Sequence, residues 1–304
     1  MLDGELLSRF EAGLDLRRPT ASAIPATVVD YGEISAIFRV AGIDGLVFKR
    51  MPLFSSRSGA DRYAQMVHTY CQLLSTAGLH LPPLETIVVA LPARPVVLYI
   101  AQQHLPDASV CHRLIKRLDL RNCRDLMVDV VTAITDVWRY NALNAPQTEL
   151  AIDGQLSNWA RPPGGRRLMY IDISTPLYRL AGIEQQDPEL LLQSAPGVLR
   201  WVIRLLFLHE VMNRYYVPRL VAADLAANLY KEQLPELVPM TVAAVNAALP
   251  SDDPPLTVGE VKRYYRQDKQ IWRLFLGARR LDRWIKTRVL KRRYDFLLPG
   301  RIQR

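Results

Sequence analysis

Two acidic side chains and one amide lie close together near the middle of the chain. Asp153 and Asn158 are five residues apart in DGQLSN, and Asp172 follows in YIDIS. The intervening PPGGRR separates two apolar runs, and this pattern is typical of a tight turn. The segment 158–172 is therefore predicted to form a β-hairpin, symmetric about Gly165, with Asn158 opposite Asp172 at its open end. Oxygen-bearing side chains gathered there could hold a hard cation and accept a proton.

The elements that must position these side chains change in character along the chain. Apolar runs bounded by turn residues predict about five strands, at 26–40 (two strands and a turn), 46–52, 85–91 and 95–101, with one helix at 58–77. Beyond Leu105 helical spacing dominates, and it predicts helices at 124–143, 189–216 and 220–231. An α+β protein of two lobes with a cleft is expected, divided into residues 1–104, 105–250 and a basic segment 251–304.

The order and spacing of these residues resemble the protein-kinase-like superfamily, closest in style to its aminoglycoside and choline kinase-type phosphotransferases. DGQLSN reproduces the D-x-x-x-x-N catalytic loop, and Asp172 stands where the family has a magnesium-binding aspartate. Lys49 in VFKR looks like the strand lysine that holds nucleotide phosphates. The resemblance covers residues 25–230 and implies a two-lobed, protein-kinase-like fold with a strand-rich N-lobe and a mainly helical C-lobe.

The resemblance also implies a role for each residue and a pair of cofactors. Asp153 would be the catalytic base that accepts a proton from an attacking hydroxyl, while Asn158 and Asp172 would bind Mg²⁺ on the phosphates of ATP. The residues implied in nucleotide binding are Lys49, Gly32 and Glu33 in the turn over the phosphates, and Gln103 in the hinge at 101–106.

One departure from the family pattern leaves two functions open. The helix predicted at 58–77 contains no glutamate to pair with Lys49, and its only acid is Asp61. Glu33 could take that place, or the pair could be absent. The chain is therefore expected to be either an ATP-dependent phosphotransferase acting on a hydroxyl of a small molecule or glycan, or a nucleotide-binding pseudokinase. The loose D-I-S triplet at Asp172 argues against a protein kinase.

Composition narrows the class of protein. The 304 residues are 49% hydrophobic and 23% charged, as in ordinary globular proteins. The three cysteines form no CxxC pair and the five histidines show no metal-binding spacing, which argues against a zinc site. Acidic residues recur in the first thirty positions and charges interrupt the apolar run at 198–212, so neither a signal peptide nor a membrane span is predicted. A cytoplasmic protein is expected.

The basic charge is concentrated at the end of the chain. Residues 261–304 contain 15 Lys or Arg and 3 Asp, whereas the first 260 residues have a net charge of −3. Large apolar residues interleave with these cations, so the segment could be a helix that packs on the body of the protein. It could also make peripheral contact with an anionic membrane, a third functional alternative. No recognised motif accompanies the charge, which argues against nucleic acid as a partner. Of these alternatives, packing of the basic segment on the body of the protein is favoured.

Overall fold

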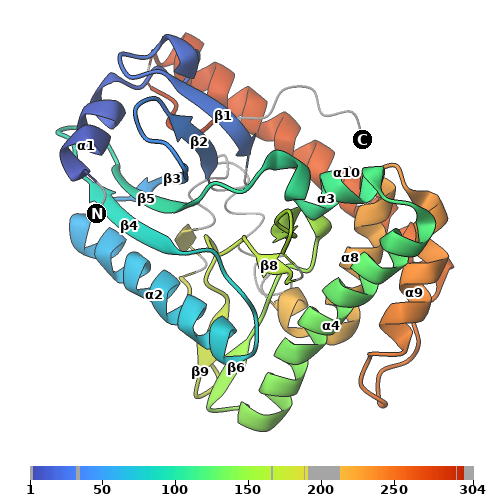
Figure 1. Cartoon of the computed structure of the whole chain (residues 1–304). Helices are drawn as coiled ribbons and strands as arrows, with labels where there is room; N and C mark the ends of the chain where they lie inside the picture. The colour runs from blue at the N-terminus through green and yellow to red at the C-terminus, as the bar shows by residue number, and fades with distance from the viewer. Residues whose placement is uncertain are drawn as a thin grey trace.

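A five-stranded antiparallel sheet forms the first lobe. The computed structural model describes residues 3–31, 35–165, 167–187, 189–190, 213–291 and 293–297. The strands are β1 (Ala26–Tyr31), β2 (Ala36–Val40), β3 (Leu46–Phe54), β4 (Leu84–Val89) and β5 (Val96–Gln103), in the order β1-β2-β3-β5-β4. Helices α1 (Gly4–Gly13) and α2 (Arg57–Thr76) belong to the two cores on opposite faces of this sheet (Figure 1).

Alternation along the central strands assigns each side chain to one of those cores. On β3, Phe48 packs in the core that contains α1, whereas Met51 packs in the core that contains α2. On β5, Tyr99 belongs to the α1 core and Ile100 to the α2 core. Lys49 lies directly opposite Ile100 across the β3–β5 ladder and therefore faces α2 and the second lobe.

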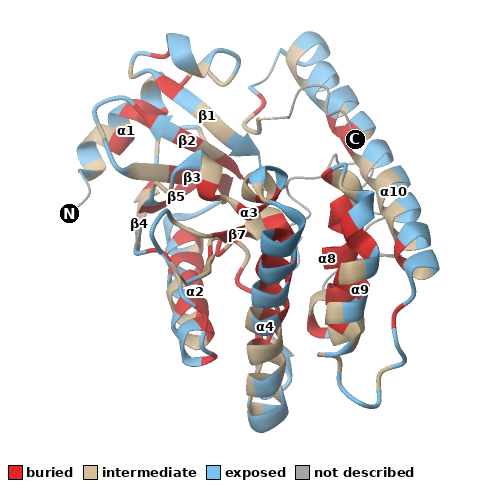
Figure 2. Ribbon diagram, turned by 45° about the vertical axis from the view of Figure 1, so that its right-hand side comes forward, coloured by how far each residue is buried: buried red, intermediate tan, exposed pale blue. Residues whose placement is uncertain are grey.

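The second lobe is mainly helical. Its longer helices are α4 (Leu120–Asn144), α8 (Pro218–Lys231), α9 (Val238–Asn246) and α10 (Val258–Trp284), with a short α3 (Cys111–Leu114) and a π-helical turn at Ile285–Val289. Short strands β6 (Thr148–Leu150), β9 (Tyr178–Leu180) and β10 (Ile183–Glu184) form one sheet, and β7 (Trp159–Ala160) and β8 (Met169–Tyr170) form a hairpin. One apolar core is shared by α2, α4, α8 and α9 (Figure 2).

Capping residues determine where the two longest of the described helices begin. The side chain of Asp119 accepts a hydrogen bond from the backbone N–H of Asn122 at the start of α4. At the start of α10, Thr257 and Glu260 form a reciprocal capping box. Since α10 packs on α8, the basic segment is anchored to the second lobe through part of its surface.

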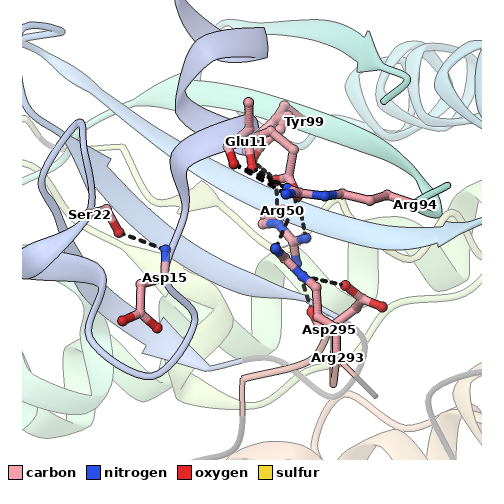
Figure 3. A network of polar contacts seen from close by, with 9 residues as sticks. Glu11, Asp15, Ser22, Arg50, Arg94, Tyr99, Arg293 and Asp295 are labelled. Atoms are coloured by element: carbon pink, nitrogen blue, oxygen red, sulfur yellow. Dashed lines mark hydrogen bonds and ion pairs between the residues drawn. The ribbon is translucent and has the colours of Figure 1, made fainter. Parts of the chain in front are cut away.

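A buried polar network connects the outer face of the first sheet to the end of the chain (Figure 3). Arg50 on β3 and Glu11 on α1 are each 2% exposed and form a bidentate ion pair with both N–O distances at 2.7 Å. The Tyr99 hydroxyl donates to Glu11 at 2.5 Å, and Arg50 also donates to the backbone oxygen of Asp295 at 2.7 Å. Residues 293–297 therefore lie against the first lobe, although α10 before them packs on the second.

The predicted α+β architecture, with a strand-rich N-lobe and a mainly helical C-lobe, is confirmed. The strands at 26–40, 46–52, 85–91 and 95–101 and the helices at 58–77, 124–143 and 220–231 are present, with ends shifted by a few residues. The helix predicted at 189–216 lies almost entirely outside the described residues. The small β6–β9–β10 sheet was not predicted. Within the described parts, none of the helices is long and apolar enough to cross a bilayer.

Candidate functional site

Lys49 and Asp172 meet where the two lobes adjoin. The Lys49 ammonium lies 3.1 Å from Asp172 Oδ1 and also donates to the backbone oxygen of Ile171 at 2.9 Å. Its side chain is only 8% exposed, and a buried ammonium requires such partners. The alternation of β3 turns Lys49 inward, and the hairpin that ends at Asp172 meets it from the second lobe. Two residues identified separately in the sequence are thus brought into direct contact.

The predicted hairpin is present, but its register differs by one residue from the prediction. Trp159 pairs with Tyr170, so paired residue numbers sum to 329 and not 330. Asn158 therefore lies opposite Ile171, whose backbone N–H donates to the backbone carbonyl oxygen of Asn158 at 2.9 Å. The turn lies at 162–165 and is closed by a hydrogen bond from Gly165 N to Pro162 O at 3.0 Å, with Gly164 at a φ of +72°. A proline at the second position and a positive-φ glycine at the third are typical of a type II turn. The turn does not lie at the centre of the hairpin, because one residue separates it from β7 and three separate it from β8.

Two tyrosines of α2 hold the segments that carry the acidic residues. The Tyr70 hydroxyl donates to the backbone oxygen of Ala151 at 2.7 Å, and the Tyr63 hydroxyl donates to that of Ser174 at 2.9 Å. Their spacing of seven residues places both on one face of the helix. Where a glutamate would have paired with Lys49, α2 thus offers two neutral donors to the backbone beside Asp153 and Asp172.

The loop from Asp153 to Asn158 is closed by its own hydrogen bonds. Asp153 Oδ1 accepts from Gln155 N at 3.0 Å, and Asn158 Nδ2 donates to the Asp153 backbone oxygen at 3.1 Å. The loop is also tied to α8, because Asn228 Oδ1 accepts from the backbone N–H of Leu156 at 3.2 Å. Both ends of the D-x-x-x-x-N segment are therefore held in place before any ligand binds.

Asp153 has the electrostatics of a base that works near neutrality. Burial, reinforced by the nearby carboxylates of Asp224 and Asp172, raises the pKa of Asp153 to about 7. The hydrogen bond from Gln155 and the charge of Arg214 oppose this rise without cancelling it. A carboxyl with such a pKa can take a proton from a hydroxyl and release it again near neutral pH.

Asp224 on α8 is the neighbouring carboxylate whose charge acts most strongly on Asp153. Asp224 is 7% exposed, and its Oδ1 accepts from Arg214 at 2.9 Å and from the Tyr264 hydroxyl at 3.0 Å. These hydrogen bonds agree with a structural role, yet its charge also acts on Asp153. No local sequence pattern indicates that proximity, because it arises only when α8 packs against the loop from Asp153 to Asn158.

The donor set of Asn158 and Asp172 fits a magnesium ion held together with phosphates. Asn158 donates from its amide nitrogen to Asp153 O at 3.1 Å, and its amide oxygen accepts from the Ser157 hydroxyl at 3.4 Å. Asp172 receives Lys49 and Ser174 through Oδ1. Among the described residues no group of three or more His, Cys, Asp or Glu could hold a metal ion. One carboxylate and one amide match magnesium sites that rely on substrate phosphates for further ligands.

The remaining predicted nucleotide contacts are less well placed or not described. Gln103 is exposed and belongs to the same set of alternating β5 positions as Tyr99, which faces α1. Its neighbour Gln102 shares the inward set with Ile100, is 3% exposed, and has an Nε2 without a hydrogen-bond partner among the described residues. The period-two pattern of β5 could have identified Gln102. Gly32 and Glu33 lie outside the described residues.

The chain has a two-lobed, kinase-like fold, in which a lysine from the sheet lobe faces an aspartate from the helical lobe. A family model matches residues 19–283, and the chain belongs to this family, the Family of unknown function (DUF6206). None of the curated proteins compared with the chain matches it.

A solved structure titled "WaaP in complex with acyl carrier protein" is similar to this chain at 12% identity. The similarity covers 79% of this chain and 89% of that one, with a TM-score of 0.35. At this identity and TM-score, the similarity indicates neither a substrate nor a partner for this chain.

Proposed function

We propose that this protein is an ATP-dependent phosphotransferase that acts on a hydroxyl of a small molecule or glycan. The observation that carries the proposal is the contact between Lys49 and Asp172, made across the two lobes and beside Asp153. A cation and two acids at this spacing suit phosphoryl transfer, in which catalysis consists mainly of positioning and charge stabilisation.

Each residue would have one task. Asp153 would accept the proton of the acceptor hydroxyl as its oxygen attacks the γ-phosphorus and ADP departs. Lys49 would hold phosphate oxygens as a point charge, having been kept in place by Asp172 in the absence of nucleotide. Asn158 and Asp172 would hold Mg²⁺, which, when bound, would neutralise negative charge on the phosphates.

A specific observation also favours the second candidate, a nucleotide-binding pseudokinase. The carboxylate found with Lys49 belongs to Asp172, the residue required for the metal, and α2 contributes neutral tyrosines in this region. If Lys49 stayed on Asp172, the metal would lose a ligand and turnover would fail while nucleotide could still bind.

The first test measures thermal stabilisation of the full chain by Mg-ATP. A ligand that binds only the folded state at a hundred times its Kd stabilises it by roughly 2.7 kcal/mol. Wild type should therefore melt at a higher temperature with Mg-ATP, and Lys49→Met should lose this shift. Lys262→Met, at an exposed lysine of α10, is the matched control and should keep it. Absence of any shift in folded wild type would contradict both nucleotide-site proposals.

The second test separates the two candidates by turnover. Transfer of labelled γ-phosphate to water and to a panel of sugars and alcohols is measured for wild type and for Asp153→Asn. An enzyme should keep the Mg-ATP shift and lose roughly 10²- to 10⁴-fold in rate on this substitution. A pseudokinase should bind Mg-ATP and show the same residual rate in both proteins.

A further inference from the structure

Helix α10 has one surface packed on the body of the protein. Val261 is fully buried where α10 meets α8, and Leu276 is 8% exposed further along. The guanidinium of Arg279 lies 5.6 Å from the ring centroid of Phe275 and 5.5 Å from that of Phe296, and its side chain is buried. These contacts are the packing that the sequence favoured, and they leave the rest of the helix surface unexplained.

A second set of large apolar side chains on the same segment faces solvent. Its members are Ile271, Leu274, Leu281, Trp284, Ile285, Val289 and Leu290, with exposures from 39% to 75%. Seven such residues within twenty positions contrast with nine elsewhere in the described chain. Leu274 and Leu281 are two helical turns apart, so they lie on one side of α10. We call these seven residues, with Arg266 and Arg273, the outer face; it corresponds to the exposed side of α10 in Figure 2.

Cations flank this apolar set. Arg266 and Arg273 are exposed and two helical turns apart, so they lie on one side of α10. Arg273 directly precedes Leu274 in the sequence. Two of the three acids of α10 form ion pairs, Glu260 with Arg219 at 2.7 Å and Asp282 with Lys286 at 3.0 Å, and the third is Asp268. The outer face therefore offers apolar surface and positive charge together, in a helix too polar to cross a bilayer.

We propose that the outer face of α10 docks this protein on an anionic lipid surface. The apolar side chains would enter the boundary between headgroups and acyl chains, while the arginines would meet lipid phosphates. Trp284, 56% exposed, is a residue type that favours this boundary. Nucleic acid would satisfy the charges but leave the apolar residues in water.

The inference does not depend on the phosphotransferase proposal, and its test uses no nucleotide. Co-sedimentation of the full chain is measured with phosphatidylcholine vesicles that contain phosphatidylglycerol, and with phosphatidylcholine vesicles alone. We expect binding to the anionic vesicles at least about tenfold stronger than to the neutral ones, weakening as salt rises.

Matched variants assign the binding to the outer face. Leu281→Glu and Arg273→Glu should each lower the affinity for anionic vesicles by roughly tenfold or more. Leu143→Glu, at a leucine of α4 that is 86% exposed, and Arg121→Glu, at an exposed arginine of the same helix, should leave it unchanged. All four positions are exposed, so circular dichroism and thermal melting should show folded proteins.

Several results would overturn the proposal. One is failure of wild type to sediment with anionic vesicles. Another is an equal loss of binding in Leu143→Glu and Leu281→Glu. A concentration-dependent dimer that Leu281→Glu abolishes would reassign the surface to a second copy. Tight binding of duplex DNA or RNA that Arg273→Glu abolishes and Leu281→Glu leaves intact would reassign it to nucleic acid.

Discussion

At the scale of single residues, Asp153 is the most informative group. The charges of Asp172, Asp224 and Arg214 all act on it, so its pKa reflects the combined electrostatics of the site. Burial, followed by Asp224, raises this pKa to about 7. A raised pKa means that the folded protein binds the proton more tightly than the unfolded chain does. Stability from this group is therefore present at acidic pH and is lost as pH rises toward about 7.

Replacement of Asp153 by Asn should reveal the stability that wild type loses as pH rises. The variant removes the ionisable group, so its stability relative to wild type should increase between about pH 4 and pH 8, by on the order of 1 kcal/mol after allowance for solvent screening. Urea denaturation at both pH values measures the difference. Asp61→Asn, at an exposed aspartate of α2, is the control and should show no such increase. If the two variants behave alike, the pKa of Asp153 is not raised.

At the scale of elements, the loop from Asp153 to Asn158 is held by packing as well as by hydrogen bonds. The two α2 tyrosines bind backbone oxygens on either side of it, and α8 supplies Asn228 from below. Gly154, next to Asp153, lies where the loop passes closest to other elements. A Cβ at Gly154 would lie 2.9 Å from Ile134 Cδ1 on α4 and 3.1 Å from Val221 Cγ1 on α8.

Gly154→Ala should therefore destabilise the protein. Overpacking of a well-packed core costs roughly 1–3 kcal/mol, and here the strain would also move Asp153. Gly277→Ala is the matched control, because a Cβ at that exposed position of α10 has no atom within 4 Å. Since alanine is the better helix former by about 1 kcal/mol, Gly277→Ala should leave stability unchanged or improve it. Thermal melting of both variants decides the question, and equal behaviour would refute the close-packing argument.

At the scale of the whole molecule, the Glu11–Arg50 pair connects three distant parts of the chain. It joins α1 to β3, and Arg50 extends the connection to Asp295 beyond α10 (Figure 3). Burial alone would raise the pKa of Glu11, but hydrogen bonds from Arg50 and Tyr99 outweigh it and leave the pKa below 4.5. The stability from this group is thus present above pH 4.5 and lost as pH falls through the lowered pKa.

Glu11→Gln should be among the most damaging single substitutions in the first lobe. It leaves the Arg50 charge buried without its partner, which costs roughly 3–5 kcal/mol near neutral pH. The deficit relative to wild type should shrink as the solution is acidified below the lowered pKa, where wild type also loses the charge. Denaturant titrations over that range measure it. Glu5→Gln, on the exposed face of the same helix, should cost only a few tenths of a kcal/mol.

Local sequence patterns were sufficient to predict most of the strands and helices and part of the candidate site. Apolar alternation located the strands around Lys49, and helical spacing located α2, α4 and α8, because each pattern reflects the geometry of one segment. The D-x-x-x-x-N segment and the hairpin could be predicted from the sequence for the same reason. The hairpin register could not, since unequal numbers of residues connect the turn at 162–165 to β7 and to β8.

The sequence by itself determined which residue types stand at the ends of which strands and helices, and that an ammonium, two carboxylates and an amide were present. Only the tertiary structure decided which of them meet. Lys49 and Asp172 are 123 residues apart and touch because β3 turns one inward and the β7–β8 hairpin brings up the other. The same packing put Asp224 beside Asp153. Such proximities arise from contacts between separate elements, and no local sequence pattern records them.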